Sequence, residues 1–302
     1  MPAVALAAEV MAQDSQGRFA ATGEDNIMRD KKGLGDGTKE SGDLCSNAVF
    51  SGLRSDFWKK IIRHESISST NEFALSLSLR GPESGTVIIA DSQARGRGRM
   101  GRVWISPPGT NIYMSAVLKP EIAVRNAAFL TVAAALACAH ALRGEAGLNV
   151  NIRWPNDLMV CDKKIGGILT EIRSGHDEIN FAVIGIGINV NSWSKDFPEE
   201  LANIATSVKE VTGRYFSRSK IIAQILNELE RWYKKLTVDG SFLLLEEWKR
   251  LSCTIGKVVR ITLCSEVISA IAEDIDEEGM LVLRLASGER RRISSGDLTE
   301  LR

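Results

Sequence analysis

Residues 93–104, QARGRGRMGRVW, place four arginines and three glycines within ten positions. The arginines are Arg95, Arg97, Arg99 and Arg102, and no carboxylate stands among them. Arginine presents a planar fork of donors that matches phosphate and carboxylate oxygens, and glycine lets the backbone approach a ligand closely. Because the four charges repel one another when the loop is empty, we expect a flexible loop that closes over an anionic ligand.

Other interpretations of this loop are weaker. Gly96–Gly101 matches the GxGxxG fingerprint of dinucleotide sites, but that motif works only where a helix begins. The following residues, RVWISPPG, contain β-branched positions and two prolines, which oppose a helix. No GxxxxGK[ST] motif occurs, which excludes a P-loop. A solvated loop and a nonspecific nucleic-acid patch stay open, although the flanks VIIADS and VWISPP lack the basic neighbours of such patches.

The composition bounds the class of protein. Of 302 residues 44% are hydrophobic and 25% charged, as in ordinary soluble globular proteins. Lys+Arg and Asp+Glu both number 38, so an anion site must be local.

Five scattered cysteines without a CxxC pair indicate a reducing compartment, and His64, His140 and His176 have no second ligand at zinc-site spacing. The apolar run Phe129–Leu142 is too short to cross a bilayer, so we expect a cytoplasmic protein without a membrane segment.

The pattern of apolar residues predicts an α+β fold. Residues 1–52 are rich in glycine and charge and are expected to be a largely disordered or linker-like leader. Residues 53–250 form the larger domain, in which helix and strand patterns follow one another. Strands are expected at 61–67, 85–92, 111–120, 149–160, 163–174 and 179–190, and helices at 68–80, 126–142, 218–236 and 242–251. Residues 251–302 contain four short strands joined by tight turns, which predicts a small β-barrel.

Five motifs, taken together, resemble the biotin protein ligase family in order and spacing. They are SSTNE at 68–72, DSQARGRGRMGRVWISPPGTNIYMS at 91–115, RWPNDLMV at 153–160, KKIGGILTE at 163–171 and GIGINV at 185–190. The resemblance covers about residues 53–302. It implies a mixed β-sheet catalytic domain flanked by helices, class II synthetase-like and of the biotin/lipoate ligase type, followed by a C-terminal SH3-like barrel.

The resemblance also implies a two-step reaction. Biotin and ATP give biotinyl-5'-AMP and pyrophosphate, and a lysine of a biotin carboxyl carrier protein, part of acetyl-CoA carboxylase or a related carboxylase, then takes the biotinyl group. Lys164 and Arg99 are the expected catalytic residues, because a fixed cation offsets repulsion between a carboxylate and a phosphate. By spacing alone, the weaker alternative for Lys164 is a surface lysine of a hairpin. Mg²⁺ is expected to accompany ATP without a protein cage, with Asp157 as the candidate protein ligand.

The remaining site residues follow from the same motifs. The resemblance implies a biotin site of Ser69, Thr70, Asn71, Gln93, Gly96, Arg97, Gly98, Arg99, Lys164, Gly167, Gly185 and Gly187. It implies a nucleotide site of Arg99, Arg102, Trp104, Asn156, Asp157 and Asn189. Glycine weakens a strand, so close approach of a flat ligand is the expected reason for Gly166, Gly167, Gly185 and Gly187. Some of these residues also have an ordinary structural explanation. Ser69 could be a helix N-cap, Trp104 a core residue, and Asn156–Asp157 a turn.

The chain departs from some family members. Residues 1–50 lack the three-helix pattern and basic recognition helix of a DNA-binding domain, so we expect a ligase without operator binding, as a monomer or homodimer. The loop opens ARGRGR where the family more often has glycine first. Two alternatives stay open: a lipoate or octanoate protein ligase, although the Gly-triplet and His-Asp pair of that group are absent, and a nonspecific nucleic-acid binder that uses the arginine loop.

Overall fold

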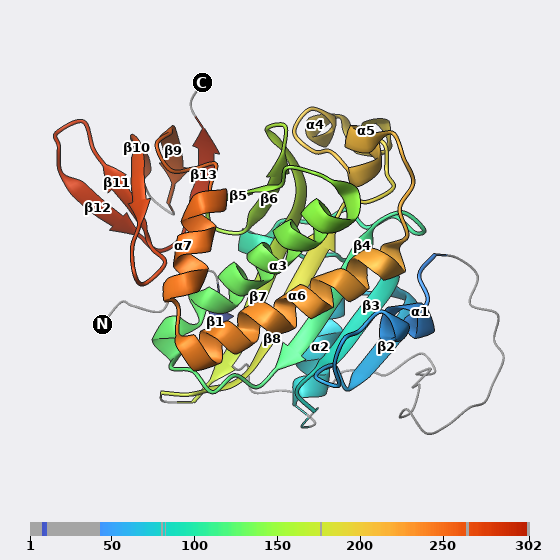
Figure 1. The fold of residues 1–302 in the computed structure, drawn as a ribbon. Helices are drawn as coiled ribbons and strands as arrows, with labels where there is room; N and C mark the ends of the chain where they lie inside the picture. Colours follow the sequence, from blue (N-terminus) through green and yellow to red (C-terminus); the bar gives the residue numbers. More distant parts are fainter. Residues whose placement is uncertain are drawn as a thin grey trace.

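The computed structural model describes residues 8–10, 43–79, 81, 83–175, 177–263 and 266–300. These residues form two β-sheets with helices packed against the larger one (Figure 1). The strands of the larger sheet are ordered β2-β3-β4-β8-β7-β6-β5, with β1 beside β7. Their bounds are β1 (Ala8–Val10), β2 (Lys60–Ile67), β3 (Thr86–Gln93), β4 (Ile112–Leu118), β5 (Asn151–Arg153), β6 (Asp157–Val160), β7 (Lys163–Ser174) and β8 (Ile179–Ile188).

The larger sheet is mixed, as expected. Strands β2 and β3 run parallel, with Ile62 opposite Ile88, while β3, β4, β8, β7, β6 and β5 pair antiparallel in that order. The central β7 and β8 are buried over most of their length, which explains their nearly continuous apolar sequences. Residues 149–160, expected as one apolar segment, form two short strands because Trp154–Asn156 turn the chain between β5 and β6.

In β3, β4 and β8, alternate residues face two separate layers of helix. Ile89, Ala116 and Ile184 belong to the main core, which holds α3 (Ala128–Ala146) and α6 (Arg218–Asp239). Ile88 and Val183 belong to a smaller cluster on the other face, under α2 (Thr70–Ser78). Figure 1 shows α3 and α6 crossing one face of the sheet, with α2 behind it. Neighbouring residues along a strand thus face opposite sides of the sheet, as expected for a strand that other elements cover on both faces.

Two of the predicted helices follow directly from sequence periodicity. Helix α6 buries all eight apolar positions on which its prediction rests: Ile221, Ile222, Ile225, Leu226, Leu229, Trp232, Tyr233 and Leu236. Helix α7 (Phe242–Leu251) has the predicted bounds. Val124–Ala146, which includes α3, has the length and apolarity of a membrane span, but most of it is buried inside the protein, between the sheet and α6, as in a core helix.

The smaller sheet contains one strand more than expected. Its order is β12-β11-β10-β9-β13, all antiparallel. The bounds are β9 (Val258–Thr262), β10 (Val267–Ile275), β11 (Leu281–Arg284), β12 (Arg290–Ile293) and β13 (Asp297–Glu300). The sequence did not predict β13, nor the short elements between β8 and α6: η3 (Ser194–Asp196), α4 (Glu199–Ala202) and α5 (Val208–Thr212). The smaller sheet is the expected SH3-like unit, and α7 ends where it begins.

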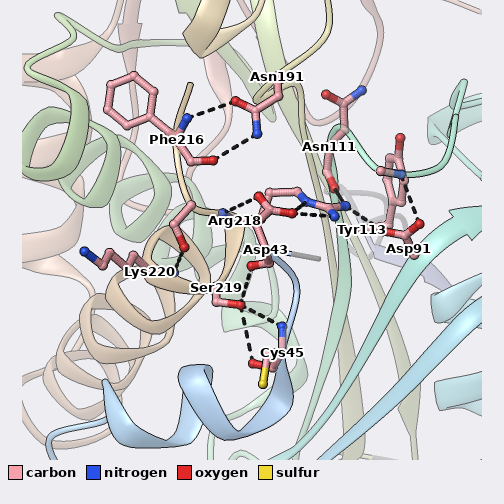
Figure 2. A network of polar contacts seen from close by, with 12 residues as sticks. Asp43, Cys45, Asp91, Asn111, Tyr113, Asn191, Phe216, Arg218, Ser219 and Lys220 are labelled. Atoms are coloured by element: carbon pink, nitrogen blue, oxygen red, sulfur yellow. Dashed lines mark hydrogen bonds and ion pairs between the residues drawn. The ribbon is translucent and has the colours of Figure 1, made fainter. Parts of the chain in front are cut away.

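Residues 43–51, which the sequence analysis assigned to the leader, are instead part of the larger fold. They include α1 (Ser46–Ser51), and Leu44 and Val49 are buried in the main core. Charge as well as apolar packing holds these residues in the fold. The guanidinium of Arg218 is 3% exposed and needs carboxylate partners. Asp43 lies 2.6 Å from it and Asp91 2.8 Å (Figure 2). Most of the remaining leader lies outside the described residues.

Candidate active site

A pocket of about 470 Å³ collects the predicted site residues. Its lining comes from the start of α2, residues 97–105, the turn Arg153–Asp157, strands β7 and β8, and the α4 region. Gly296, just before β13, and Asp297 and Leu298 of β13 also line it. Every predicted site residue except Gly96 is part of this lining. The pocket volume lies within the roughly 300–1,000 Å³ that small-molecule sites occupy.

The arginine loop folds back on itself at the pocket. Arg97 forms a β-bridge with Val103, and the turn between them is the 3₁₀ segment η1 (Arg99–Gly101). Gly101 has a φ of 73°, a conformation in which glycine avoids strain. A Cβ on Gly96 would lie 2.3 Å from the carbonyl oxygen of Trp104. This glycine permits the two arms of the loop to pair closely, and a biotin contact of Gly96 stays a prediction.

The loop arginines have partners from distant segments, contrary to the expected self-repulsion. Arg97 Nη2 lies 3.0 Å from Glu171 Oε1 on β7. Arg99 Nη1 donates to Asn156 Oδ1 at 3.3 Å, and Arg102 pairs with Asp297 of the smaller sheet. The local sequence contains no carboxylate, so these partners could be found only through the fold. They hold the loop against the pocket.

The start of α2 forms an uncharged polar cradle. Ser69 occupies the N-cap position, but its hydroxyl makes no capping hydrogen bond. Gln93 at the end of β3 takes that role, since its Oε1 accepts from the backbone N–H of Thr70 at 2.9 Å. Gln93 Nε2 in turn donates to Ser106 Oγ at 2.9 Å. The predicted Ser69, Thr70 and Gln93 are thus brought together, with the side chain of Gln93 fixed at both ends.

Asn71 is held by groups on two strands. Its Nδ2 donates to the Leu169 carbonyl at 3.1 Å and to Glu171 Oε2 at 2.8 Å. The hydroxyl of Ser115 donates to Asn71 Oδ1 at 2.6 Å. Glu171 was missed by the sequence analysis, although it ends the KKIGGILTE motif as a lone carboxylate within an apolar strand. A charge at a buried strand position was the available signal.

Lys164 and Asp157 form the charged part of the site. Lys164 Nζ lies 2.5 Å from Asp157 Oδ1 and 5.6 Å from the ring centroid of Trp104. Arg153, another residue that the sequence analysis missed, donates from Nη2 to Asp157 Oδ2 at 2.6 Å. Burial alone would raise the pKa of Asp157, but the charges and hydrogen bonds of Lys164 and Arg153 outweigh it and hold the pKa below its usual value.

The backbone of Lys164 is fixed on both sides. Its strand β7 pairs with β6, where Lys164 lies opposite Met159. On the other side the Lys164 N–H donates to the Ile204 carbonyl at 2.8 Å, and the Lys164 carbonyl accepts from the Thr206 N–H at 2.9 Å. Lys164 is therefore not a hairpin lysine free in solvent. It is half-buried and aimed at the pocket.

The strand glycines make room for side chains of the protein. A Cβ on Gly185 would lie 2.1 Å from Asn71 Oδ1, and one on Gly187 would lie 2.6 Å from the indole of Trp104. A Cβ on Gly167 would lie 3.3 Å from Cε of Lys164, and one on Gly166 would lie 2.9 Å from the Gly187 carbonyl. Asn71, Trp104 and Lys164 therefore give Gly185, Gly187 and Gly167 a reason within the protein itself, and the approach of a flat ligand to these strands stays a prediction.

Two predicted nucleotide contacts are anchored by their amides. Asn156 Nδ2 donates to the Ile168 carbonyl at 2.6 Å, which leaves its Oδ1 facing Arg99. Asn189 Nδ2 donates to the Thr206 carbonyl at 3.0 Å and so ties the end of β8 to the α4–α5 segment. Both residues line the pocket. A direct contact of Asn189 with adenine stays a prediction.

The pocket lining carries a surplus of positive charge. Five cationic side chains face three carboxylates; the cations are Arg97, Arg99, Arg102, Arg153 and Lys164, and the carboxylates are Asp157, Asp162 and Asp297. The buried indole Nε1 of Trp104 has no hydrogen-bond partner among the described residues. The site can therefore accept an anionic group, and a free donor is available beside it.

The fold and this pocket define the class of protein. Residues 64–189 match the model of the Biotin/lipoate A/B protein ligase family, and residues 254–298 match the Biotin protein ligase C terminal domain. The smaller sheet is therefore a domain that accompanies the larger one in this class.

Individual relatives narrow the assignment. The bifunctional ligase/repressor BirA of Bacillus subtilis is 35% identical over 261 residues, which cover 86% of this chain and 80% of that protein. The biotin--[acetyl-CoA-carboxylase] ligase of Mycobacterium tuberculosis is 30% identical over 81% of this chain and 90% of its own length. The structure of the Aquifex aeolicus biotin protein ligase in complex with biotin and ATP superposes with a TM-score of 0.70, at 28% identity over 81% of this chain and 99% of that one. The chain belongs to the biotin protein ligase family and is a ligase.

Proposed function

We propose that this ligase activates biotin with ATP to biotinyl-5'-AMP and transfers the biotinyl group to the acceptor lysine of a biotin carboxyl carrier protein. The observation that carries the proposal is the joint lining of one pocket by an uncharged polar cradle and a surplus of cations. Biotin has two parts that match these two parts of the lining. Its ureido ring is polar and neutral, and its valeryl chain ends in a carboxylate. The relative named as an acetyl-CoA-carboxylase ligase supports a carrier of that carboxylase, or of a related one, as the acceptor.

In the first step, a carboxylate oxygen of biotin attacks the α-phosphorus of ATP, and the bond to the β-phosphate oxygen breaks to release pyrophosphate. Both reactants are anionic, so their approach requires fixed positive charge. Lys164 supplies such a charge on a backbone held from both sides, and Asp157 keeps its ammonium in place. Arg99, bound to Asn156 at the rim of the same pocket, supplies a second charge over the phosphate.

In the second step, the neutral amine of the acceptor lysine attacks the acyl carbon of the mixed anhydride, AMP leaves with the bonding electrons, and one proton is lost from the nitrogen. The anhydride must be protected from water until the acceptor arrives. The arginine loop serves this purpose, because Arg97, Arg99 and Arg102 each hold it to a different segment of the fold, at Glu171, Asn156 and Asp297.

Asp157 does not fit the role of a magnesium ligand that the sequence suggested. Its Oδ1 is 2.5 Å from Lys164 Nζ, and its Oδ2 accepts from Arg153 at 2.6 Å. A dication beside these two cations would be repelled, and Mg²⁺ prefers oxygen ligands with room for its own waters. We therefore assign Asp157 to the positioning of Lys164 and not to the binding of a metal ion.

The two alternatives fit the site less well. A lipoyl or octanoyl group has no ureido ring, so the amide and hydroxyl cradle around Asn71 would face an apolar chain with its polar groups unpaired. A nucleic-acid binder would direct its arginines outward to a phosphate backbone. Here Arg97, Arg99 and Arg102 instead contact Glu171, Asn156 and Asp297 of the protein itself. A cytoplasmic location and the lack of operator binding stay predictions.

Pyrophosphate exchange into ATP tests the first step. Exchange should appear with biotin and be absent with lipoate or octanoate. Transfer is tested by adding a carrier domain of acetyl-CoA carboxylase, with its acceptor lysine replaced by arginine as the control. Exchange that depends on lipoate or octanoate instead of biotin would refute the proposal. Affinity for RNA or DNA that falls steeply with salt and ignores biotin would favour the nucleic-acid alternative.

A further inference from the structure

Glu171 is a buried carboxylate whose only part in the steps above is its contact with Arg97. It lies on β7, its side chain is 0% exposed, and it does not line the pocket. A carboxylate in such a position costs free energy unless charge or hydrogen bonds compensate it. Its two oxygens show what it does, because each one holds a different residue of the pocket lining.

The first of these residues is Asn71. Glu171 Oε2 accepts from Asn71 Nδ2 at 2.8 Å, and the Leu169 carbonyl accepts from the same Nδ2 at 3.1 Å. Both amide hydrogens of Asn71 are thereby used, and its Oδ1 accepts from Ser115. A carbonyl oxygen accepts two hydrogen bonds, so one place on Oδ1 stays open. Glu171 thus fixes Asn71 as an acceptor, which suits a ureido N–H and offers nothing to an aliphatic chain.

The second residue is Arg97 of the loop. Arg97 Nη2 lies 3.0 Å from Glu171 Oε1, while the side chain of Arg97 is still 34% exposed. When the loop lifts away, the carboxylate loses this cation within a buried environment. That loss disfavours the open loop, so Glu171 favours the position in which Arg97 covers the pocket.

We propose that Glu171 is a positioning residue that couples closure of the arginine loop to recognition of the biotin ring. The inference deepens the proposed function and rests on it. A ligand that engages Asn71 Oδ1 stabilises the orientation in which Nδ2 holds Glu171, and Glu171 in this place holds Arg97. Recognition of the correct ring and sealing of the site therefore share one carboxylate.

The direct test is Glu171→Gln, which keeps the size and the acceptor for Asn71 but removes the charge that holds Arg97. The KM for biotin in pyrophosphate exchange should rise about tenfold, the order expected for losing one contact to a charged group. The kcat should stay within about threefold, because no group that touches the reacting atoms has changed. A role confined to the fold would instead lower the melting temperature and the active fraction, and so reduce kcat with KM unchanged.

Glu171→Asp is the second variant, because it retains the buried charge and is less disruptive to folding. Its shorter side chain cannot reach Asn71 and Arg97 together, so the KM for biotin should again rise. Trypsin cleavage within the loop supplies a readout besides activity. Biotin should slow this cleavage in the wild type, and about tenfold more biotin should be needed in either variant.

A double-mutant cycle tests whether Glu171 changes the KM for biotin through Arg97. If Glu171 acts through Arg97, then Glu171→Gln combined with Arg97→Gln should raise KM no more than the larger single effect. Additive effects would overturn the coupling. Glu266→Gln is the matched control, since it removes an exposed carboxylate paired with Arg291 in the smaller domain and should leave KM unchanged.

The outcomes separate this inference from the proposed function. A wild type without biotin-dependent exchange refutes the function itself. A wild type that is active, with Glu171 variants whose KM and loop protection are unchanged, refutes only the coupling. A drop confined to kcat and melting temperature assigns Glu171 to the fold and also overturns the proposal.

Discussion

Lys164 Nζ and Asp157 Oδ1 lie 2.5 Å apart and join the start of β7 to the start of β6. The two strands are neighbours in the sheet, so the ion pair adds to a backbone that is already fixed. A cation held in this way needs little rearrangement when negative charge develops beside it. The first three predictions follow from this pair and from the loop above it.

Lys164→Ala should lower the rate of biotin-dependent pyrophosphate exchange by about a thousandfold, because it removes a fixed transition-state charge. The melting temperature should change by only a few degrees, since the side chain fills no part of the apolar core. Lys163→Ala, one residue earlier on the same strand, is the control and should keep near-normal exchange. An unchanged burst of adenylate in Lys164→Ala would refute the role of the ammonium.

Arg99→Gly should let biotinyl-5'-AMP escape, because the loop loses its contact with Asn156. Free adenylate in the medium, and labelling of lysines on an unrelated bystander protein, should both increase. Arg95→Gly tests the same substitution at an exposed loop arginine that does not line the pocket, and it should retain the adenylate. Equal adenylate release from the two variants and the wild type would contradict the function of the loop as a cover.

At neutral pH, the Asp157→Asn variant should be less stable than the wild type. This difference in stability should shrink at low pH. The pKa of Asp157 is held below its ordinary value, so its ionised form stabilises the fold fully above about pH 4, and that contribution is lost as the pH falls through the folded-state pKa. The difference in melting temperature between wild type and Asp157→Asn should be constant from about pH 5 to 8 and shrink below about pH 4.

The control for this substitution is Asp162→Asn, in the neighbouring turn, where asparagine tolerates the positive φ of 59°. At neutral pH it should keep a melting temperature close to that of the wild type. A stability difference for Asp157→Asn that stays the same down to about pH 2 would mean that the carboxylate is not held by Lys164 and Arg153 in the manner described.

Gly185→Ala should weaken biotin binding, because the new Cβ would lie 2.1 Å from Asn71 Oδ1 and the amide must move. Overpacking of this kind typically costs about 1–3 kcal/mol of stability. Gly144→Ala is the matched control, since this exposed glycine of α3 has no atom within 4 Å of the added Cβ. It should stabilise the helix by about 0.5–1 kcal/mol. Titration with biotin and thermal unfolding measure both effects, and an unaltered KM for biotin in Gly185→Ala would contradict the packing of Asn71 over Gly185.

Much of the fold could be predicted because its larger elements carry their own periodicity. Helix α6 repeats apolar residues at helical spacing, and the buried faces of β3, β4, β7 and β8 follow from runs of β-branched residues. Strand β13 and helices α4 and α5 have four or five residues each, too few for a periodic pattern. Their structure depends on contacts with distant segments, such as the pairing of β13 with β9.

The candidate site shows the same division. Residues within a recognisable motif, such as Asn71 and Lys164, could be named from sequence. Their partners could not, because Glu171 meets Asn71 across 100 positions and Asp297 meets Arg102 across 195. Nothing local marks such residues except a charge at an unexpected position. The glycines are intermediate, since their spacing indicated close approach but could not name the side chains of Asn71, Trp104 and Lys164 that lie against them.

The contribution of residues 296–298 to the pocket wall has a consequence for biosynthesis. Until β13 is synthesised, the chain holds the residues of the cradle and Lys164 but lacks Asp297, the partner of Arg102. The pocket wall and one of the three contacts that hold the arginine loop are therefore completed only when translation has delivered β13.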